Sequence, residues 1–194
     1  MSGTRERILD VATEVLGANP DAGMGEVAAA AGVVRRTVYG HFPSRADLVL
    51  ALTRHASKEL TAALAEGPDD QGADEAWAGF VGRLWPLLHR YRVLVVLRRG
   101  ELGPDIHAVL APVDAALADL VRRGQEDGVF GRHLPAEVLG QVAWSSVFTI
   151  ADEDLAHGGL AAGAAVTTSL LVLGVPSSRA TALTARVGDP GPAQ

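Results

Sequence analysis

The sequence predicts an all-α protein, with an N-terminal helix-turn-helix domain of three short helices and a larger C-terminal helical domain, about nine helices in total. Three observations lead to this prediction. Apolar residues recur every three or four positions along almost the whole chain of 194 residues, which is the spacing of one helix face. Segments containing Gly and Pro divide these periodic stretches. No segment alternates apolar and polar residues as a half-buried strand would.

The first part of the chain holds short, closely spaced helices. The segment "GANPDAG" breaks the first periodic stretch, and Gly32 ends the second. Ser44 follows Pro43 and is a favoured N-cap, so a long helix should begin at Arg45. We expect helices at residues 4–16, 24–31, 34–41 and about 45–66, and we place the boundary of the two domains between residues 46 and 47.

The remaining residues, 47–194, are predicted to form the larger domain. The polar segment "EGPDDQGAD" and the loop "DGVFGRHLP" separate its helices. The run "VLVVL" at 93–97 is β-prone but isolated, so we interpret it as a short buried helix. We expect further helices at about 74–92, 105–126, 135–157 and 160–174, with the last of these ending the fold and a frayed tail over 187–194.

The segment "AGVVRRTVYGHF" has the pattern of a helix-turn-helix, in which a glycine turn separates two short helices. Val38 and Phe42 should face inward, because they are four residues apart on the third helix. Arg35, Arg36 and Gly40 then lie on another side, available to the major groove of DNA.

Phosphate groups are the expected partners of the polar residues that follow, Tyr39, His41 and Arg45. Other interpretations stay open. Arg35 and Arg36 could be ordinary solvated charges, Tyr39 a packing residue, and His41 a helix cap.

Charge is distributed unevenly. Residues 1–60 hold equal numbers of basic and acidic residues, so the net charge of −6 belongs entirely to residues 61–194. A neutral N-terminal part on an acidic body suits local phosphate binding without indiscriminate binding to nucleic acid.

The stretches "RERILDVATEVL" and "EVAAAAGVVRRTVYGHFPSRADLV" resemble the tetracycline-repressor (TetR/AcrR-like) family of bacterial transcriptional regulators. The resemblance covers roughly the first quarter of the chain. It implies that Arg35, Arg36, Thr37 and Gly40 approach base edges or adjacent phosphates. It also implies that Tyr39 and His41 contact phosphates and that Arg45 replaces a lysine that binds the DNA backbone.

The chain departs from the family pattern at three places. Val34 stands where Ser or Thr usually caps the third helix, and Arg36 stands where a small residue is common. The second helix begins with Gly23-Met24-Gly25, without the usual Ser or Thr. We therefore expect an unusual operator.

The resemblance further implies a homodimer whose C-terminal domain binds a small-molecule effector. Pockets are mostly apolar with a few polar anchors, and aromatic residues at helical spacing are also the usual content of a core, so this second interpretation stays open. The candidate pocket residues are Trp77, Phe80, Leu84, Trp85, Leu88, Arg98, His107, Trp144 and Phe148.

Two stretches rich in small and apolar residues, about 136–157 and 160–174, are expected to form the dimer interface as a four-helix bundle. Residues 158–178 lack charges and are long enough to cross a membrane. Their Gly, Pro, Ser and Thr content makes a buried helix the better interpretation, so no membrane partner is expected.

Several classes of protein are disfavoured. The chain has no cysteine, which excludes disulfides and Cys-ligated zinc. It has no HExxH, GxSxG or P-loop motif, so we predict no catalytic residues, no metal and no cofactor. The N-terminus lacks the pattern of a secretory signal, and a cytoplasmic location is expected.

The sequence and the family resemblance together predict a ligand-responsive DNA-binding regulator, and the resemblance implies that it is a repressor released from a palindromic double-stranded DNA operator by a small molecule. The alternative is a helical dimer that binds a small molecule without sequence-specific DNA binding.

Overall fold

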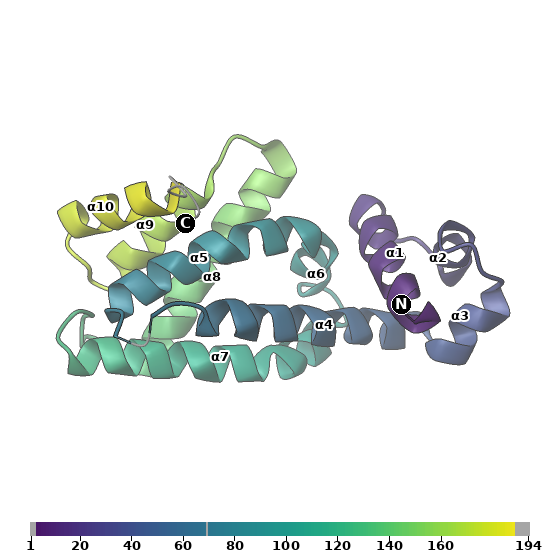
Figure 1. Ribbon diagram of the computed structural model, residues 1–194, viewed down its shortest axis with the longest axis horizontal. Coiled ribbons are helices and arrows are strands. Elements are labelled where there is room, and N and C mark those ends of the chain that lie inside the picture. Colours follow the sequence, from purple (N-terminus) through teal and green to yellow (C-terminus); the bar gives the residue numbers. More distant parts are fainter. Residues whose placement is uncertain (1–2, 69, 189–194) are drawn as a thin grey trace. The chain divides into compact units, whose positions relative to one another are not determined.

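The computed structural model describes residues 3–68 and 70–188, and every regular element within these ranges is a helix (Figure 1). The predicted all-α fold class is therefore confirmed. The helices are α1 (Thr4–Ala18), α2 (Met24–Ala30), α3 (Arg35–His41), α4 (Arg45–Ala65), α5 (Ala73–Arg90), α6 (Arg92–Leu97), α7 (Gly103–Glu126), α8 (Ala136–His157), α9 (Ala162–Val172) and α10 (Ser177–Gly188).

The chain divides into two compact units. The head unit contains the residues up to Lys58 together with Leu88–Leu110, and the body unit contains Glu59–Leu87 and the residues from Ala111 onward. The head unit thus includes the predicted N-terminal domain, and also α6. The predicted boundary between residues 46 and 47 falls inside α4.

In the head unit, α1 packs against α2 and α6, and α2 packs against α3. The core side chains Ile8, Leu16 and Val27 have no exposed surface. Val38 and Phe42 are also buried, as the spacing predicted. Burial of such side chains, about 1.5–3 kcal/mol each, holds these short helices together.

The turn between α2 and α3 requires glycine. Gly32 adopts a φ of +65°, a conformation that is strained for residues with a Cβ. The amide of Val33 donates to the carbonyl of Ala28 at 3.0 Å, which closes α2 and lets α3 begin two residues later.

Ser44 caps α4 as predicted. Its Oγ accepts a hydrogen bond from the amide of Asp47 at 3.1 Å and donates one to the Asp47 carboxylate at 2.7 Å. The cap fixes where α4 starts, directly after α3.

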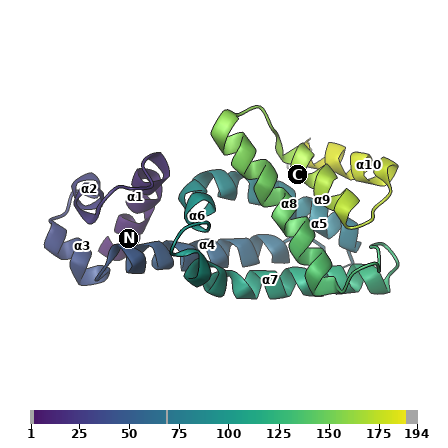
Figure 2. The ribbon, with the colours of Figure 1, turned by 180° about the vertical axis from the view of Figure 1, so that it is seen from behind.

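In the body unit, α9 packs against both α8 and α10, and the three helices lie together in both views (Figures 1 and 2). The indole N–H of Trp77, on α5, donates to Ser169 Oγ on α9 at 3.0 Å inside the core. Arg179 of α10 donates to the buried carboxylate of Asp74 at 2.7 Å. These contacts join α5 to the C-terminal helices.

The expectation that a helix at 160–174 ends the fold is wrong. α9 is shorter, Gly174 turns the chain with a φ of +87°, and α10 follows. α10 is rich in Ala, Thr and Arg and holds two large apolar residues, Leu183 and Val187, so the sequence offers little apolar signal for it, although Ala180 and Leu183 are buried. Of the tail expected to fray, Val187 and Gly188 belong to α10, and the rest lies outside the described residues.

The run "VLVVL" is helical, as predicted, and lies within α6. Among the described residues no helix combines the length and apolarity needed to span a membrane.

Candidate nucleic-acid interface and effector cavity

The seven-residue helix α3 buries little of itself. Within it Val38 is the buried residue, Thr37 is half-buried, and the remaining side chains are exposed. The exposed residues include all the predicted groove-facing and phosphate-contacting residues of this helix, namely Arg35, Arg36, Tyr39, Gly40 and His41.

Arg35 and Arg36 differ in their surroundings. The guanidinium of Arg35 lies 6.0 Å from the centre of the Tyr39 ring, and its Nε lies 3.5 Å from where a Cβ on Gly25 would be. Arg35 therefore folds back over Tyr39 and the start of α2. Arg36 is exposed one position further along the helix, so it is the better placed of the two to reach a base edge.

Arg45 has an intramolecular role that the sequence did not indicate. Its Nε donates to the carbonyl of Ala22 at 3.2 Å, and its Nη2 donates to the carbonyl of Pro20. The side chain is half-buried and ties the start of α4 to the loop between α1 and α2. Its contact with the DNA backbone stays a prediction, since a guanidinium has five donor hydrogens.

Arg5 adds a positive charge to this region and was not among the predicted residues. Its guanidinium lies 5.1 Å from the centre of the Phe42 ring, and the His41 ring lies 6.4 Å from the same ring. The sequence offers one signal for it, a basic residue in the first turn of α1, but that signal is common on helix surfaces.

The aromatic candidates for the effector pocket pack against one another. Trp144 lies 5.6 Å from Phe80 and 4.7 Å from Phe148, measured between ring centres, and the second pair is edge-to-face. Trp77, Phe80, Leu84, Leu88 and Trp144 are buried, whereas Trp85 and Phe148 are half-buried. None of these residues lines the cavities described below.

The two polar candidates lie in the head unit, whereas the aromatic candidates lie in the body unit. Arg98 is half-buried. His107 is exposed, and its Nδ1 lies 2.7 Å from the carbonyl of Gly103 in its own helix.

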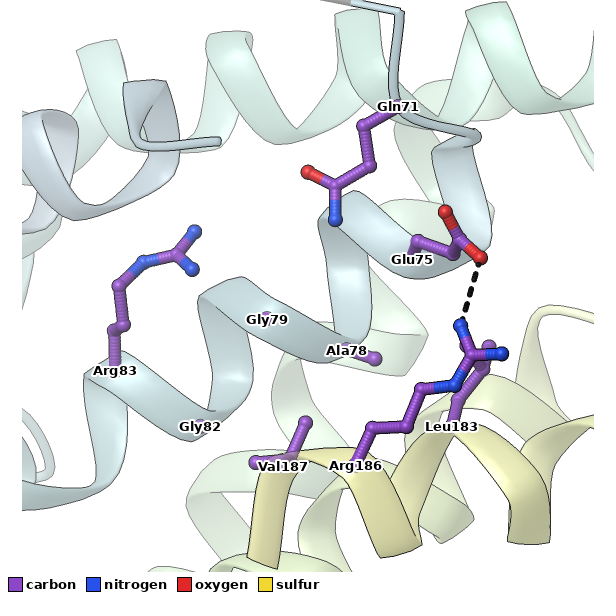
Figure 3. A pocket seen from close by; sticks show the side chains of 9 residues that line it. All are labelled: Gln71, Glu75, Ala78, Gly79, Gly82, Arg83, Leu183, Arg186 and Val187. Atoms are coloured by element: carbon purple, nitrogen blue, oxygen red, sulfur yellow. Dashed lines mark hydrogen bonds and ion pairs between the residues drawn. The ribbon is translucent and has the colours of Figure 1, made fainter. Parts of the chain in front are cut away.

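A cavity of about 450 Å³ lies between α5 and α10 in the body unit (Figure 3). Two glycines on α5 form its floor, and the close-up shows Arg83 on one side of them and Glu75 with Arg186 on the other. The lining residues are Gln71, Glu75, Ala78, Gly79, Gly82, Arg83, Leu183, Arg186 and Val187.

Arg83 is held rigidly at this cavity. Its Nε donates to the carbonyl of Ala63 at 2.9 Å, and its Nη2 donates to the carbonyl of Glu66 at 2.8 Å. The carboxylate of Glu66 lies 3.3 Å from Nε. Its Nη1 lies 2.9 Å from where a Cβ on Gly79 would be, so this end of the guanidinium projects over the cavity floor.

Hydrogen-bond donors dominate the polar lining. Glu75 accepts from Arg179 at 3.0 Å and from Arg186 at 3.2 Å, so its charge is already compensated. The amide nitrogen of Gln71 points toward α5 (Figure 3). The hydrogen bond to Asp74, and after it the one to Glu75, raises the pKa of Arg179 above its ordinary value, so Arg179 keeps its positive charge. No sequence motif indicates this cavity; the nearest signal is the spacing of Gly79 and Gly82, which permits close approach of another helix.

Two further cavities lie within single units. One of about 430 Å³ in the body unit is lined by Thr61, Leu64, Ala65, Ala76, Ala116, Asp119, Leu120 and Arg123. Another of about 350 Å³ in the head unit is lined by Asp10, Thr13, Glu14, Arg90 and Arg92. Across residues 3–68 and 70–188, no three His, Asp or Glu side chains gather in a way that could hold a metal ion.

Residues 8–52 match the family model described as bacterial regulatory proteins, tetR family. This segment contains most of α1, all of α2 and α3, and the start of α4, and hence the whole candidate interface except Arg5.

The chain is 44% identical over 79 residues to the HTH-type transcriptional repressor LfrR of Mycolicibacterium smegmatis. The match covers 39% of this chain and 42% of that repressor, so it spans less than half the length of the relative.

Solved structures extend the likeness to the whole fold. The fatty acid degradation regulator FadR from Bacillus halodurans has a TM-score of 0.78 at 20% identity, over 89% of this chain and 96% of that one. LfrR from Mycobacterium smegmatis, in complex with proflavine, has a TM-score of 0.62 at 25% identity, over 98% of each chain. Residues 8–52 therefore match the tetR family of bacterial regulatory proteins in sequence, and the chain as a whole shares its fold with the solved structure of LfrR.

Proposed function

We propose that this protein is a ligand-responsive DNA-binding transcriptional regulator, which acts as a homodimeric repressor and leaves a palindromic operator when a small molecule binds. One observation carries the proposal: α3 follows a glycine turn and exposes nearly all its polar side chains instead of burying them. A helix in that position enters the major groove in helix-turn-helix proteins.

Each polar residue of this surface has an expected part in binding. Arg36 donates to O6 and N7 of a guanine, the commonest specific contact of arginine. Arg35, Thr37 and the bare backbone at Gly40 approach neighbouring base edges or phosphates, whereas Tyr39, His41 and Arg45 bind phosphates and fix the register. Affinity therefore falls steeply with salt, because each neutralised phosphate releases counterions.

The dimer is proposed to form through α8 and α9. Three of their large apolar side chains are exposed, namely Val138 (43%), Val142 (46%) and Leu171 (47%), and the first two lie one turn apart. Burial of these side chains against a second copy of the chain would stabilise the dimer through the hydrophobic effect. A symmetric dimer then presents two α3 helices to half-sites about 34 Å apart.

The cavity between α5 and α10 is the proposed effector site. Arg83, Arg186 and Gln71 all offer donors there, and the single lining carboxylate is already paired. Leu183 and Val187 provide an apolar wall. This combination favours a small organic molecule with an anionic group and an apolar body.

A matched pair of variants tests the effector site. Arg186→Met removes a donor from this cavity, and Arg123→Met removes one from the neighbouring cavity. Benzoate and octanoate, with their uncharged amides as controls, should raise the midpoint of thermal unfolding of the wild type and of Arg123→Met, but less that of Arg186→Met. Equal shifts in the unfolding midpoint of the two variants would contradict this effector site. That result would not bear on the proposed DNA binding.

A cytoplasmic location and the lack of catalytic activity follow from this function. The alternative, a helical dimer that binds a small molecule without recognising a DNA sequence, predicts no enrichment in the experiment below.

The function is tested by selecting bound sequences from a random duplex library with the purified protein. The expected result is one palindromic sequence whose affinity drops steeply between low and physiological salt. A protein that is dimeric yet enriches no sequence contradicts the proposal.

A further inference from the structure

The residue before α3 is an unusually exposed apolar side chain. Val34 is 69% exposed, more than any other large apolar residue in the described part of the chain. Val38, the same residue type one helical turn later, is completely buried. Spacing alone would put both on one helix face. They differ because Val34 is the N-cap, with an extended backbone at φ −76° and ψ 150°.

The side chain of Val34 does not cap α3. The side chain makes no capping hydrogen bond, whereas Ser, Thr, Asp or Asn would supply one to the first turn of α3. The capping contact that does form uses the backbone, with the amide of Thr37 donating to the Val34 carbonyl at 2.9 Å. A small polar residue would serve the same backbone and stabilise the helix more.

Val34 lies at the N-terminal end of α3, where an exposed side chain can reach DNA bases. The N-terminal residues of a recognition helix are the ones that contact base edges, and Arg36 is exposed two residues further on. In the major groove, the C5 methyl of thymine is the distinctive apolar group on a base edge. The exposed apolar side chain of Val34 is suited to an apolar contact with that methyl group.

We infer that Val34 contacts the C5 methyl group of a thymine in each half-site and thereby selects thymine over cytosine and uracil at that position. The inference rests on the proposed function, because it needs α3 to lie in the major groove. It assigns Val34 a part in specificity, beside the guanine contact proposed for Arg36.

Deoxyuridine substitution isolates this contact, because deoxyuridine pairs like thymine and lacks only the methyl group. In the duplex obtained by selection, each thymine is replaced by deoxyuridine symmetrically in both half-sites, and affinity is measured at fixed salt. The wild type should lose about fourfold per half-site at one thymine position, the factor that burial of one methyl group contributes.

Two valine variants give the matched comparison. Val34→Ala should lose the dependence on that methyl group, whereas Val96→Ala, at another exposed valine (52%) outside α3, should keep it. Val34→Ser guards against a folding defect, because a serine cap should hold or raise the midpoint of thermal unfolding while the methyl dependence disappears.

The outcomes separate the two proposals. If the methyl effect is the same for wild type and Val34→Ala at every thymine, the inference is wrong while the DNA-binding function stands. If no duplex is enriched at all, the function itself fails, and the inference fails with it.

Discussion

The sequence predicts functional residues on both α3 and α5, but these residues differ in their exposure to solvent. The candidate residues of α3 are exposed: Arg35, Arg36 and Tyr39 contribute little to the core. The candidates of α5 are its core: Trp77, Phe80 and Leu84 have no exposed surface. Exposed residues that the fold does not need are the better indicators of function, whereas buried aromatic residues are first explained by packing.

The largest difference between the two helices should appear on truncation to alanine. Trp77→Ala removes a buried ring and its hydrogen bond to Ser169, so we expect the free energy of unfolding to fall by about 3–5 kcal/mol. Tyr39→Ala, at a side chain 43% exposed, should change it by about 0.5 kcal/mol or less. Denaturant unfolding at one protein concentration measures both, and similar losses would contradict the contrast.

Two helical glycines sharpen the comparison. A Cβ on Gly82 of α5 would overlap Cγ1 of Val187 on α10, whereas a Cβ on Gly40 of α3 meets nothing within 4 Å. Gly82→Ala should therefore destabilise by about 1–3 kcal/mol through overpacking, and Gly40→Ala should stabilise by up to about 1 kcal/mol. The double variant with Val187→Ala should recover part of the loss; no recovery would mean that the two helices do not meet at this point.

Substitution of Arg45, which is half-buried, should cost more stability than substitution of Arg36, which is exposed. Arg45→Ala loses hydrogen bonds to two carbonyls in the loop before α2, so we expect a loss of about 1–2 kcal/mol of stability. Arg36→Ala, at an exposed side chain, should change stability by about 0.5 kcal/mol or less.

In DNA binding the expectation for Arg45→Ala is a uniform loss over all sequences and a salt slope smaller by about 1. A changed base preference for this variant would mean that Arg45 contacts bases rather than phosphates.

The smallest effect concerns an exposed ion pair between α7 and α8. A hydrogen bond from its own backbone amide, and then one from Arg122 at 2.7 Å, lowers the pKa of Glu137 below its ordinary value of 4.5. Because the folded pKa is the lower one, the contribution to stability is complete above the ordinary pKa and is lost as the pH falls through the folded pKa.

An NMR titration of the Glu137 carboxyl group measures this directly. In Arg122→Met the pKa of Glu137 should rise partway toward its ordinary value, since the backbone hydrogen bond remains. A wild-type pKa of Glu137 at or above the ordinary value would show that the pair does not persist in solution.

The sequence predicted the head unit better than the body unit. The helices of the head unit have strong local signals: Gly32 marks a turn that needs a positive φ, Ser44 marks a cap, and Val38 with Phe42 marks the inner face of α3. Each signal depends on neighbouring residues, so the sequence contains it completely.

The body unit depends on contacts between distant residues, which leave no local signal. Trp77 meets Ser169, Arg179 meets Asp74, and Gly82 meets Val187, each across roughly a hundred residues of chain. The cavity between α5 and α10 could not be predicted for this reason, since α10 itself was missed. The exposure of Val34 could not be predicted for a different reason. Its apolar character and its spacing from Val38 suggest burial, whereas the extended backbone of the N-cap position exposes it.

The central claim is that the exposed face of α3 recognises DNA sequence, and Arg36 tests it most directly. Arg36→Ala and the wild type are put through the same selection from random duplexes, and the selected sequences are compared. The account predicts that one guanine in each half-site loses its preference, with affinity for the wild-type operator lower by about 1–3 kcal/mol and stability unchanged. An identical selected sequence at unchanged affinity would contradict it, because Arg36, an exposed arginine in the first turn of this helix, would then have no part in recognition.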